Sequence, residues 1–184
     1  MKTSMYIGQE YRIADWFYIH FTENPGMAFG MELGGDYGKI ILSIFRIVAV
    51  IGIGWYIVRS AKDGVHKGFL VAMAFIFAGA LGNILDSIFY GQIFTASNAH
   101  IAQTVSFGDG YANVLYGKVV DMLYFPLFDG WFPSWVPFWG DEYFMFFRPV
   151  FNIADSAITV GVILIFIFQT SFFAEPLQEA ATED

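Results

Sequence analysis

Three aspartates in apolar surroundings are the residues of this chain that could do chemistry. Asp155 lies in "FNIADSAITVGVILIFIF", Asp86 in "GALGNILDSIF" and Asp121 in "GKVVDMLYF". A carboxylate within a membrane-length apolar run is costly, which makes it a functional candidate. Two carboxyls in one apolar site share a proton, because burial and like charge raise the pKa of one of them. One can then activate a water while the other protonates a leaving group, which is the chemistry of aspartyl proteolysis.

Asparagines accompany two of these acids at helical spacing. Asn152, Asp155 and Thr159 are three and four residues apart, so they share one face of a helix. Asn83 and Asp86 are also three apart, near the end of another apolar run. The repeated pattern indicates two polar clusters at the same membrane depth, near the outer ends of their helices.

The three aspartates could also have roles other than catalysis. They could pair with Arg148 or Arg46 and merely tie helices together, although Arg46 could equally snorkel outward. Asp86 and Asp155 could form the proton relay of a small transporter or channel subunit, but no internal repeat is visible. A non-enzymatic membrane assembly factor is a third possibility. Glu23 has two interpretations, a site acid or a solvated loop acid, and we favour the second.

Composition places the chain among membrane proteins. Its 184 residues, enough for one domain, are 57% hydrophobic and only 14% charged, where soluble domains have about 25% charged residues. The net charge of -8 argues against nucleic-acid binding. The sequence has no cysteine, which excludes disulfides and thiolate sites, and the spacing of its three histidines suits no zinc peptidase. We expect no metal and no cofactor.

Three apolar segments reach the length of a membrane span, which is about 20 residues. They are Ile40–Val58, Phe69–Phe89 and Val150–Phe173. The predicted fold class is therefore an all-α membrane protein, with residues 1–173 as one domain and 174–184 as an acidic cytoplasmic tail.

The basic link between the first two spans sets the orientation. It contains Arg59, Lys62 and Lys67, and short basic loops lie on the cytoplasmic side. The first span then runs inward, and residues 1–39 and about 91–149 lie outside. Because nothing visible carries residues 1–39 across, we expect a further span upstream of Met1.

An aromatic-rich segment, residues 122–149, precedes the third span. It contains Trp131, Trp135 and Trp139 among many phenylalanines. Such rings suit the headgroup layer, so the segment predicts a collar on the membrane surface. A sharper alternative is a lip over a site that receives a lipid chain.

Four sequence blocks, in this order, carry a family resemblance. "FTENPGMAFGMEL", "GALGNILDSIFYG", "GKVVDM" and "FRPVFNIADSAITVGV" together are similar to the lipoprotein signal peptidase (signal peptidase II) family. The resemblance covers about residues 16–168. It implies four spans and a small β-structure at the membrane face that includes Asn24.

The resemblance also implies roles for single residues. The catalytic pair falls on Asp121 and Asp155, with Asp86 as the rival of Asp121. The family's Arg after Gly-Asn-x-x-Asp is Ser87 here, so either Arg148 takes its place or nothing does. The polar positions that shape the site fall on Asn24, Asn83, Asp86 and Asn152.

What the resemblance implies about function is an aspartyl endopeptidase of the bacterial cytoplasmic membrane, with its active site at the outer face. Its substrates would be diacylglyceryl-modified prolipoproteins, cut at the lipobox cysteine within membrane lipid. Two departures stand out: the first span with its Asp-Gln-x-x-Lys motif is absent here, and the segment between Asp121 and Asn152 is long.

Overall fold

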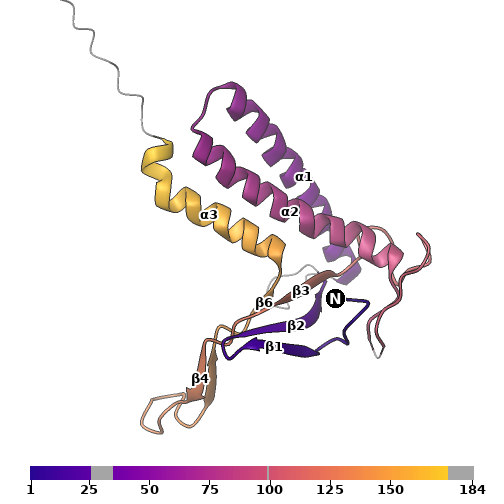
Figure 1. Cartoon of the computed structure of the whole chain (residues 1–184), viewed down its shortest axis with the longest axis vertical. Helices are drawn as coiled ribbons and strands as arrows, with labels where there is room; N and C mark the ends of the chain where they lie inside the picture. Colours follow the sequence, from indigo (N-terminus) through magenta and orange to yellow (C-terminus); the bar gives the residue numbers. More distant parts are fainter. Residues whose placement is uncertain (26–34, 99, 174–184) are drawn as a thin grey trace, which may run out of the picture.

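The fold consists of three long helices with a small sheet at one end (Figure 1). The computed structural model describes residues 1–25, 35–98 and 100–173. Within these ranges the elements follow the order β1, β2, α1, α2, β3, β4, β5, β6, α3. The predicted acidic tail, 174–184, and the Gly-x-Ala-Phe part of the first sequence block lie outside the described residues.

The three predicted spans are confirmed as helices long and apolar enough to cross a membrane. They are α1 (Gly35–Lys62), α2 (Lys67–Ile93) and α3 (Ile153–Phe172). The third span starts later than predicted, because Val150–Phe151 form strand β6 and Asn152 caps the helix. The span expected upstream of Met1 remains a prediction.

Glycines let α2 and α3 approach closely. A Cβ placed on Gly79 of α2 would lie 2.2 Å from the backbone oxygen of Ala154, at the start of α3. Further along the same pair of helices, a Cβ on Gly161 of α3 would lie 2.5 Å from the backbone oxygen of Ala72 in α2. Small residues at such crossings are the usual basis of helix packing in lipid, where no hydrophobic effect draws helices together.

The all-α description is not exact, because the segments outside the helices form two small sheets. One is antiparallel with strand order β1-β2-β3-β6: β1 (Glu10–Ala14), β2 (Phe17–Asn24), β3 (Val119–Tyr124) and β6 (Val150–Phe151). β2 and β3 are rich in the aromatic and β-branched residues that favour strands. The small β-structure expected around Asn24 is thus present, and larger than predicted.

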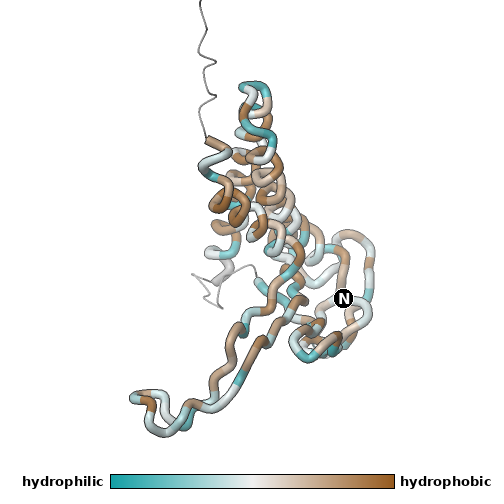
Figure 2. The backbone as a smooth tube through the Cα atoms, turned by 60° about the vertical axis from the view of Figure 1, so that its left-hand side comes forward, coloured by the Kyte–Doolittle hydropathy of each residue, from teal (hydrophilic) through white to brown (hydrophobic). Residues whose placement is uncertain are grey.

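The aromatic segment forms a separate hairpin. Its strands β4 (Phe128–Trp131) and β5 (Tyr143–Phe146) pair only with each other. Figure 2 shows it extending from the sheet as an arm with apolar strands. β6 follows directly and returns the chain to β3, so the hairpin is an excursion between two strands of the larger sheet.

Candidate active site

Asp121 lies in the middle of β3, and its side chain is almost fully buried. One carboxylate oxygen accepts a hydrogen bond from Asn152 Nδ2 at 2.8 Å, and the other accepts one from Asn24 Nδ2 at 3.2 Å. The register of β2 and β3 places Thr22 opposite Asp121. Paired residues point to the same face of a sheet, so Thr22 lies beside the site, which the sequence did not indicate.

Asp155 lies in the first turn of α3, where Asn152 and Asp155 form a capping box. The Asn152 side chain accepts from the Asp155 backbone N–H at 2.9 Å, and the Asp155 carboxylate accepts from the Asn152 N–H at 3.4 Å. Asn83 Nδ2, from α2, donates to Asp155 Oδ1 at 2.8 Å. Donors at a helix N-terminus are well placed to hold a negative charge.

Asn152 joins the two aspartates. Its Nδ2 donates to Asp121 and, at 3.1 Å, to the side-chain oxygen of Asn83, while its Oδ1 caps the backbone at Asp155. Strand β3, helix α2 and helix α3 therefore meet at one asparagine. The network contains five predicted site residues: Asn24, Asn83, Asp121, Asn152 and Asp155.

Asp86 lies beside this network rather than within it. Its carboxylate accepts a hydrogen bond from the Val120 backbone N–H at 3.4 Å and interacts with the Tyr90 hydroxyl. It is close enough for its charge to act on Asp121. Asp86 thus fixes the strand next to Asp121, while the described contacts of Asp121 lead to Asp155 through Asn152.

The electrostatics of the site favour a proton on Asp121. Burial, together with the nearby carboxylates of Asp155 and Asp86, raises the pKa of Asp121 to about 6. The hydrogen bonds from Asn152 and Asn24 act in the opposite direction, because they stabilise the carboxylate. The Asp121 carboxyl can therefore carry a proton close to neutral pH.

A cavity of about 270 Å³ adjoins the network. It is lined by Asn83, Asp86 and Tyr90 from α2, and by Asn152 from the α3 cap. A cavity of this size has room for several waters, so polar groups of the site are open to a nucleophile.

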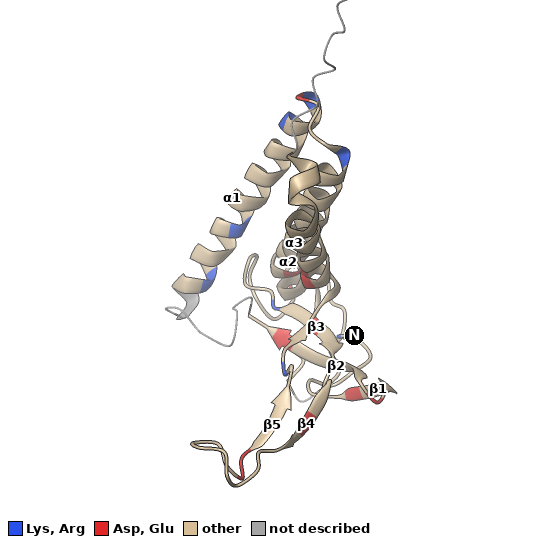
Figure 3. Cartoon of the chain, turned by 90° about the vertical axis from the view of Figure 1, so that its left-hand side faces the viewer, with Lys and Arg blue, Asp and Glu red and all other residues tan. Residues whose placement is uncertain are grey.

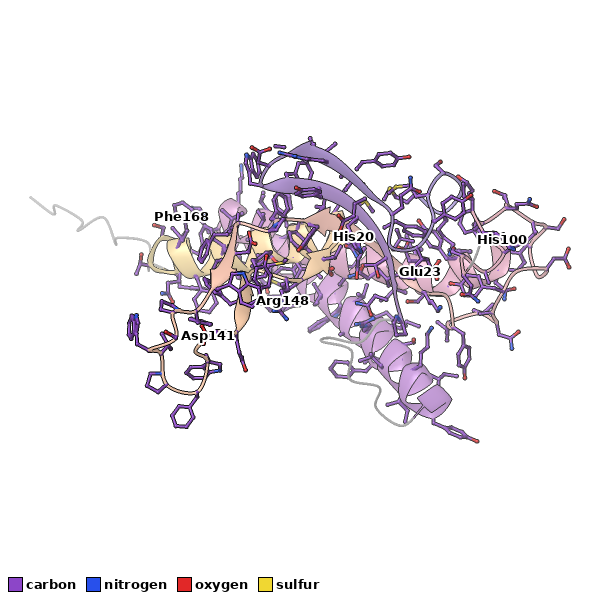
Figure 4. All side chains as sticks on the ribbon, turned by 90° about the horizontal axis from the view of Figure 1, so that it is seen from below. His20, Glu23, His100, Asp141, Arg148 and Phe168 are labelled. Carbon is purple, nitrogen blue, oxygen red and sulfur yellow. The ribbon has the colours of Figure 1, made fainter. Side chains whose placement is uncertain are left out.

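A buried ion pair supports the opposite face of β2. Glu23, next to Asn24, pairs with Lys2, and both side chains are only 3% exposed. Ser97 donates to Glu23 at 2.6 Å, and Lys118 lies 3.5 Å away at the start of β3. These cations hold the pKa of Glu23 below its ordinary value despite burial. The favoured reading of Glu23 as a solvated loop acid is wrong (Figure 4).

The predicted arginines lie elsewhere. Arg148 is exposed between β5 and β6, near the base of the hairpin (Figure 4), and among the described residues it makes no ion pair or hydrogen bond with Asp121 or Asp155. Its role as a replacement for the family's arginine remains a prediction. Arg46, on α1, is half-buried, and its charge interacts with that of Asp155.

Comparison with known proteins shows the family of the chain. The family model "Signal peptidase (SPase) II" matches residues 1–171. A lipoprotein signal peptidase of Porphyromonas gingivalis strain W83 is 52% identical over 168 residues, which cover 91% of this chain and 73% of that protein. One of Amoebophilus asiaticus is 41% identical over 179 residues, covering 96% of this chain and 72% of that protein.

A solved structure is also similar. The chain aligns with one described as a bacterial membrane enzyme, with a TM-score of 0.55, 28% identity, and coverage of 91% of this chain and 78% of that one. None of these comparisons supports a transporter. The chain is a multi-pass membrane protein and belongs to the signal peptidase II family of aspartic endopeptidases.

Proposed function

We propose that this chain removes signal peptides from diacylglyceryl-modified prolipoproteins at the lipobox cysteine, with Asp121 and Asp155 as the catalytic pair. The observation that carries the proposal is Asn152, which binds Asp121 through Nδ2 and caps the backbone of Asp155 through Oδ1. Asn152 thus donates to both carboxyls, to that of Asp121 from its side chain and to that of Asp155 from its backbone N–H, which fits a pair that acts together.

The roles of the two acids follow from their surroundings. Asp155, with donors from Asn83 and the helix N-terminus, is the base that takes a proton from water. The resulting hydroxide attacks the scissile carbonyl carbon. Asp121, whose pKa is raised, gives its proton to the leaving nitrogen as the carbon–nitrogen bond breaks. The products are a new carboxylate on the signal peptide and a free amino group on the lipid-modified cysteine.

The position of the site favours cleavage at the outer membrane face. Figure 3 shows lysine and arginine at the helix ends remote from the sheet, where Arg59, Lys62 and Lys67 lie. The site lies at the opposite ends of α2 and α3, about 30 Å away for a helix of 20 residues. With the basic end in the cytoplasm, the site faces outward, and we place the protein in the bacterial cytoplasmic membrane.

The apolar helix surfaces suit a lipid-modified substrate. The candidate spans have few residues buried within the protein. In the most apolar stretch of α3, only 6% of the residues are buried. Acyl chains on the substrate cysteine can therefore stay in lipid while the peptide reaches the polar network at the helix ends.

A paired-peptide assay tests the proposal. The reconstituted chain receives a signal peptide with a diacylglyceryl group on its lipobox cysteine, or the same peptide with a free cysteine. We expect cleavage immediately before the cysteine in the lipidated peptide and little in the other, because each buried methylene adds about 0.8 kcal/mol to membrane partitioning. Equal cleavage of both peptides would refute the substrate assignment, and cleavage of neither would refute the activity.

A further inference from the structure

The hairpin arm, residues 127–147, has two unlike faces. The register pairs Phe128 with Phe146 and Gly130 with Phe144, so these phenylalanines share one face. The rings of Phe128 and Phe146 stack at 4.5 Å, and Phe132 packs on Phe144 at 4.6 Å. On the other face Tyr143 donates a hydrogen bond to Asp129. One face of the arm is therefore made of phenylalanine, while the other is mixed and also carries Trp131 and Met145.

This phenylalanine face and the tip of the arm are exposed. Phe128 and Phe146 are about half exposed, while Trp135 and Phe138 at the tip are 79% and 93% exposed. A two-stranded hairpin alone is marginally stable in water, and large exposed apolar patches mark interaction surfaces. The arm thus has the surface of an element that is covered by something apolar.

The placement of the arm points to lipid. Figure 1 shows the arm running sideways, across the direction of the helices and past the start of α3, rather than outward beyond their ends. Ring contacts continue from the arm into the sheet, from Phe147 to Phe151 at 6.0 Å and on to Phe125 at 5.7 Å. The arm is therefore continuous with the aromatic surface of the sheet, next to the start of α3.

The charge of the arm distinguishes between electrostatic and aromatic contact with a membrane. It carries Asp129, Asp141 and Glu142 but no lysine or arginine, and Arg148 follows it. Such an arm is not attracted to anionic lipids. Tryptophan and phenylalanine instead partition into the interface through their rings, which is independent of lipid charge.

We propose that the hairpin arm binds the outer surface of the bilayer, with its phenylalanine face and the tip around Trp135 and Phe138 seated at the boundary between headgroups and acyl chains. The partner is the lipid surface itself. By this contact the arm holds β3 and β6, which flank it in the chain, against the membrane beside Asp121 and Asn152.

Fluorescence quenching in vesicles tests this contact. The full chain, with Trp16, Trp55, Trp131 and Trp139 replaced by Phe, keeps Trp135 as its one tryptophan and is reconstituted into vesicles of phosphatidylethanolamine and phosphatidylglycerol. We expect phospholipids brominated near the top of the acyl chains to quench most of the Trp135 emission. Aqueous iodide should quench little. Salt at about 0.5 M, which is enough to screen surface charge, should change neither result.

A matched control uses another largely exposed aromatic residue, on a different loop. Phe107 is 64% exposed in the segment between α2 and β3, which lies beyond the helix end in Figure 1. Phe107→Trp in a chain with all five native tryptophans replaced by Phe should show the reverse pattern, with strong iodide quenching and weak bromolipid quenching. If a four-fold replacement fails to fold, the difference in emission between the native chain and Trp135→Phe gives the same comparison.

Each other outcome overturns the proposal. Quenching of Trp135 by iodide alone would place the tip in water. Quenching by neither reagent would show that protein covers the tip, such as a second copy of the chain. If the quenching of Trp135 by brominated lipid disappeared in vesicles without phosphatidylglycerol, the contact would be electrostatic instead of aromatic.

Discussion

Asp155→Asn and Asp121→Asn are each expected to lower the rate of prolipoprotein cleavage by about 10²- to 10⁴-fold, the usual contribution of a general acid or base. Asparagine keeps the shape of the side chain but neither takes a proton from water nor donates one to a leaving amine. Because the two acids act as a unit, the double variant should be little worse than either single one. The measurement is kcat on a diacylglyceryl-modified prolipoprotein in detergent or vesicles.

Asp86→Asn is the matched control for these variants. Asp86 is a carboxyl at the same membrane level, but its described contacts are with Val120 and Tyr90. We expect a much smaller loss from Asp86→Asn, with thermal melting of all three variants close to that of the native chain. If Asp86→Asn abolished turnover while Asp121→Asn kept it, the catalytic pair would be Asp86 and Asp155.

Gly79→Ala is expected to destabilise the helix pair by about 1–3 kcal/mol or more, the range for overpacked sites. The new Cβ would lie 2.2 Å from the Ala154 backbone oxygen and 2.8 Å from Ile158 Cγ1. A backbone atom cannot rotate away, so α3 must shift relative to α2. Asn83 is one turn from Gly79 and donates to Asp155, so the shift also lengthens a hydrogen bond in the site.

Two other glycines serve as controls, with less crowding around the added Cβ. A Cβ on Gly82 would lie 3.3 Å from the Ala154 side chain, and one on Gly52 of α1 would meet nothing within 4 Å. We expect a small loss in Gly82→Ala and none in Gly52→Ala, where alanine is the better helix former. Thermal melting in detergent and cleavage rate should both follow the order Gly79, Gly82, Gly52. Equal effects at all three positions would mean that close helix approach does not govern the site.

The spans and the polar pairs could be predicted because both follow from local rules. Length and low charge define a membrane helix, and spacings of three and four place Asn152 beside Asp155. The same rule noted Asn83 and Asp86 three residues apart, but it could not predict their partners on other elements. Asn83 donates to Asp155 of α3, whereas Asp86 accepts from the backbone of β3.

The sheet could not be predicted from local patterns, because strand pairing joins residues far apart in the chain. Thr22 and Glu23 pair with Asp121 and Val120, about a hundred residues later. This pairing puts Asn24 on the face of Asp121 and Glu23 on the other, where Lys2 buries it. Nothing local in the sequence around Glu23 indicates that partner.

Arg46 shows a similar limit. Its place within an apolar span left open whether it snorkels or pairs with an acid. The place of α1 depends on its packing against the segment before β3: Lys39 donates to the Tyr116 carbonyl at 2.6 Å, and Ser43 donates to the Leu115 carbonyl at 3.4 Å. Arg46 lies about one turn beyond Ser43 and two turns beyond Lys39 on α1, within electrostatic reach of Asp155.

The pH dependence of kcat/KM tests most directly whether Asp121 and Asp155 share the working proton. Asp121 must be protonated to act as the acid, and its protonated fraction falls as the pH rises through its pKa of about 6. The account predicts an alkaline limb near that pH. Asn24→Ala removes a donor that stabilises the carboxylate, so the limb should move to higher pH by up to about one unit. A profile that stays flat through neutral pH, or one that Asn24→Ala leaves in place, would contradict the account.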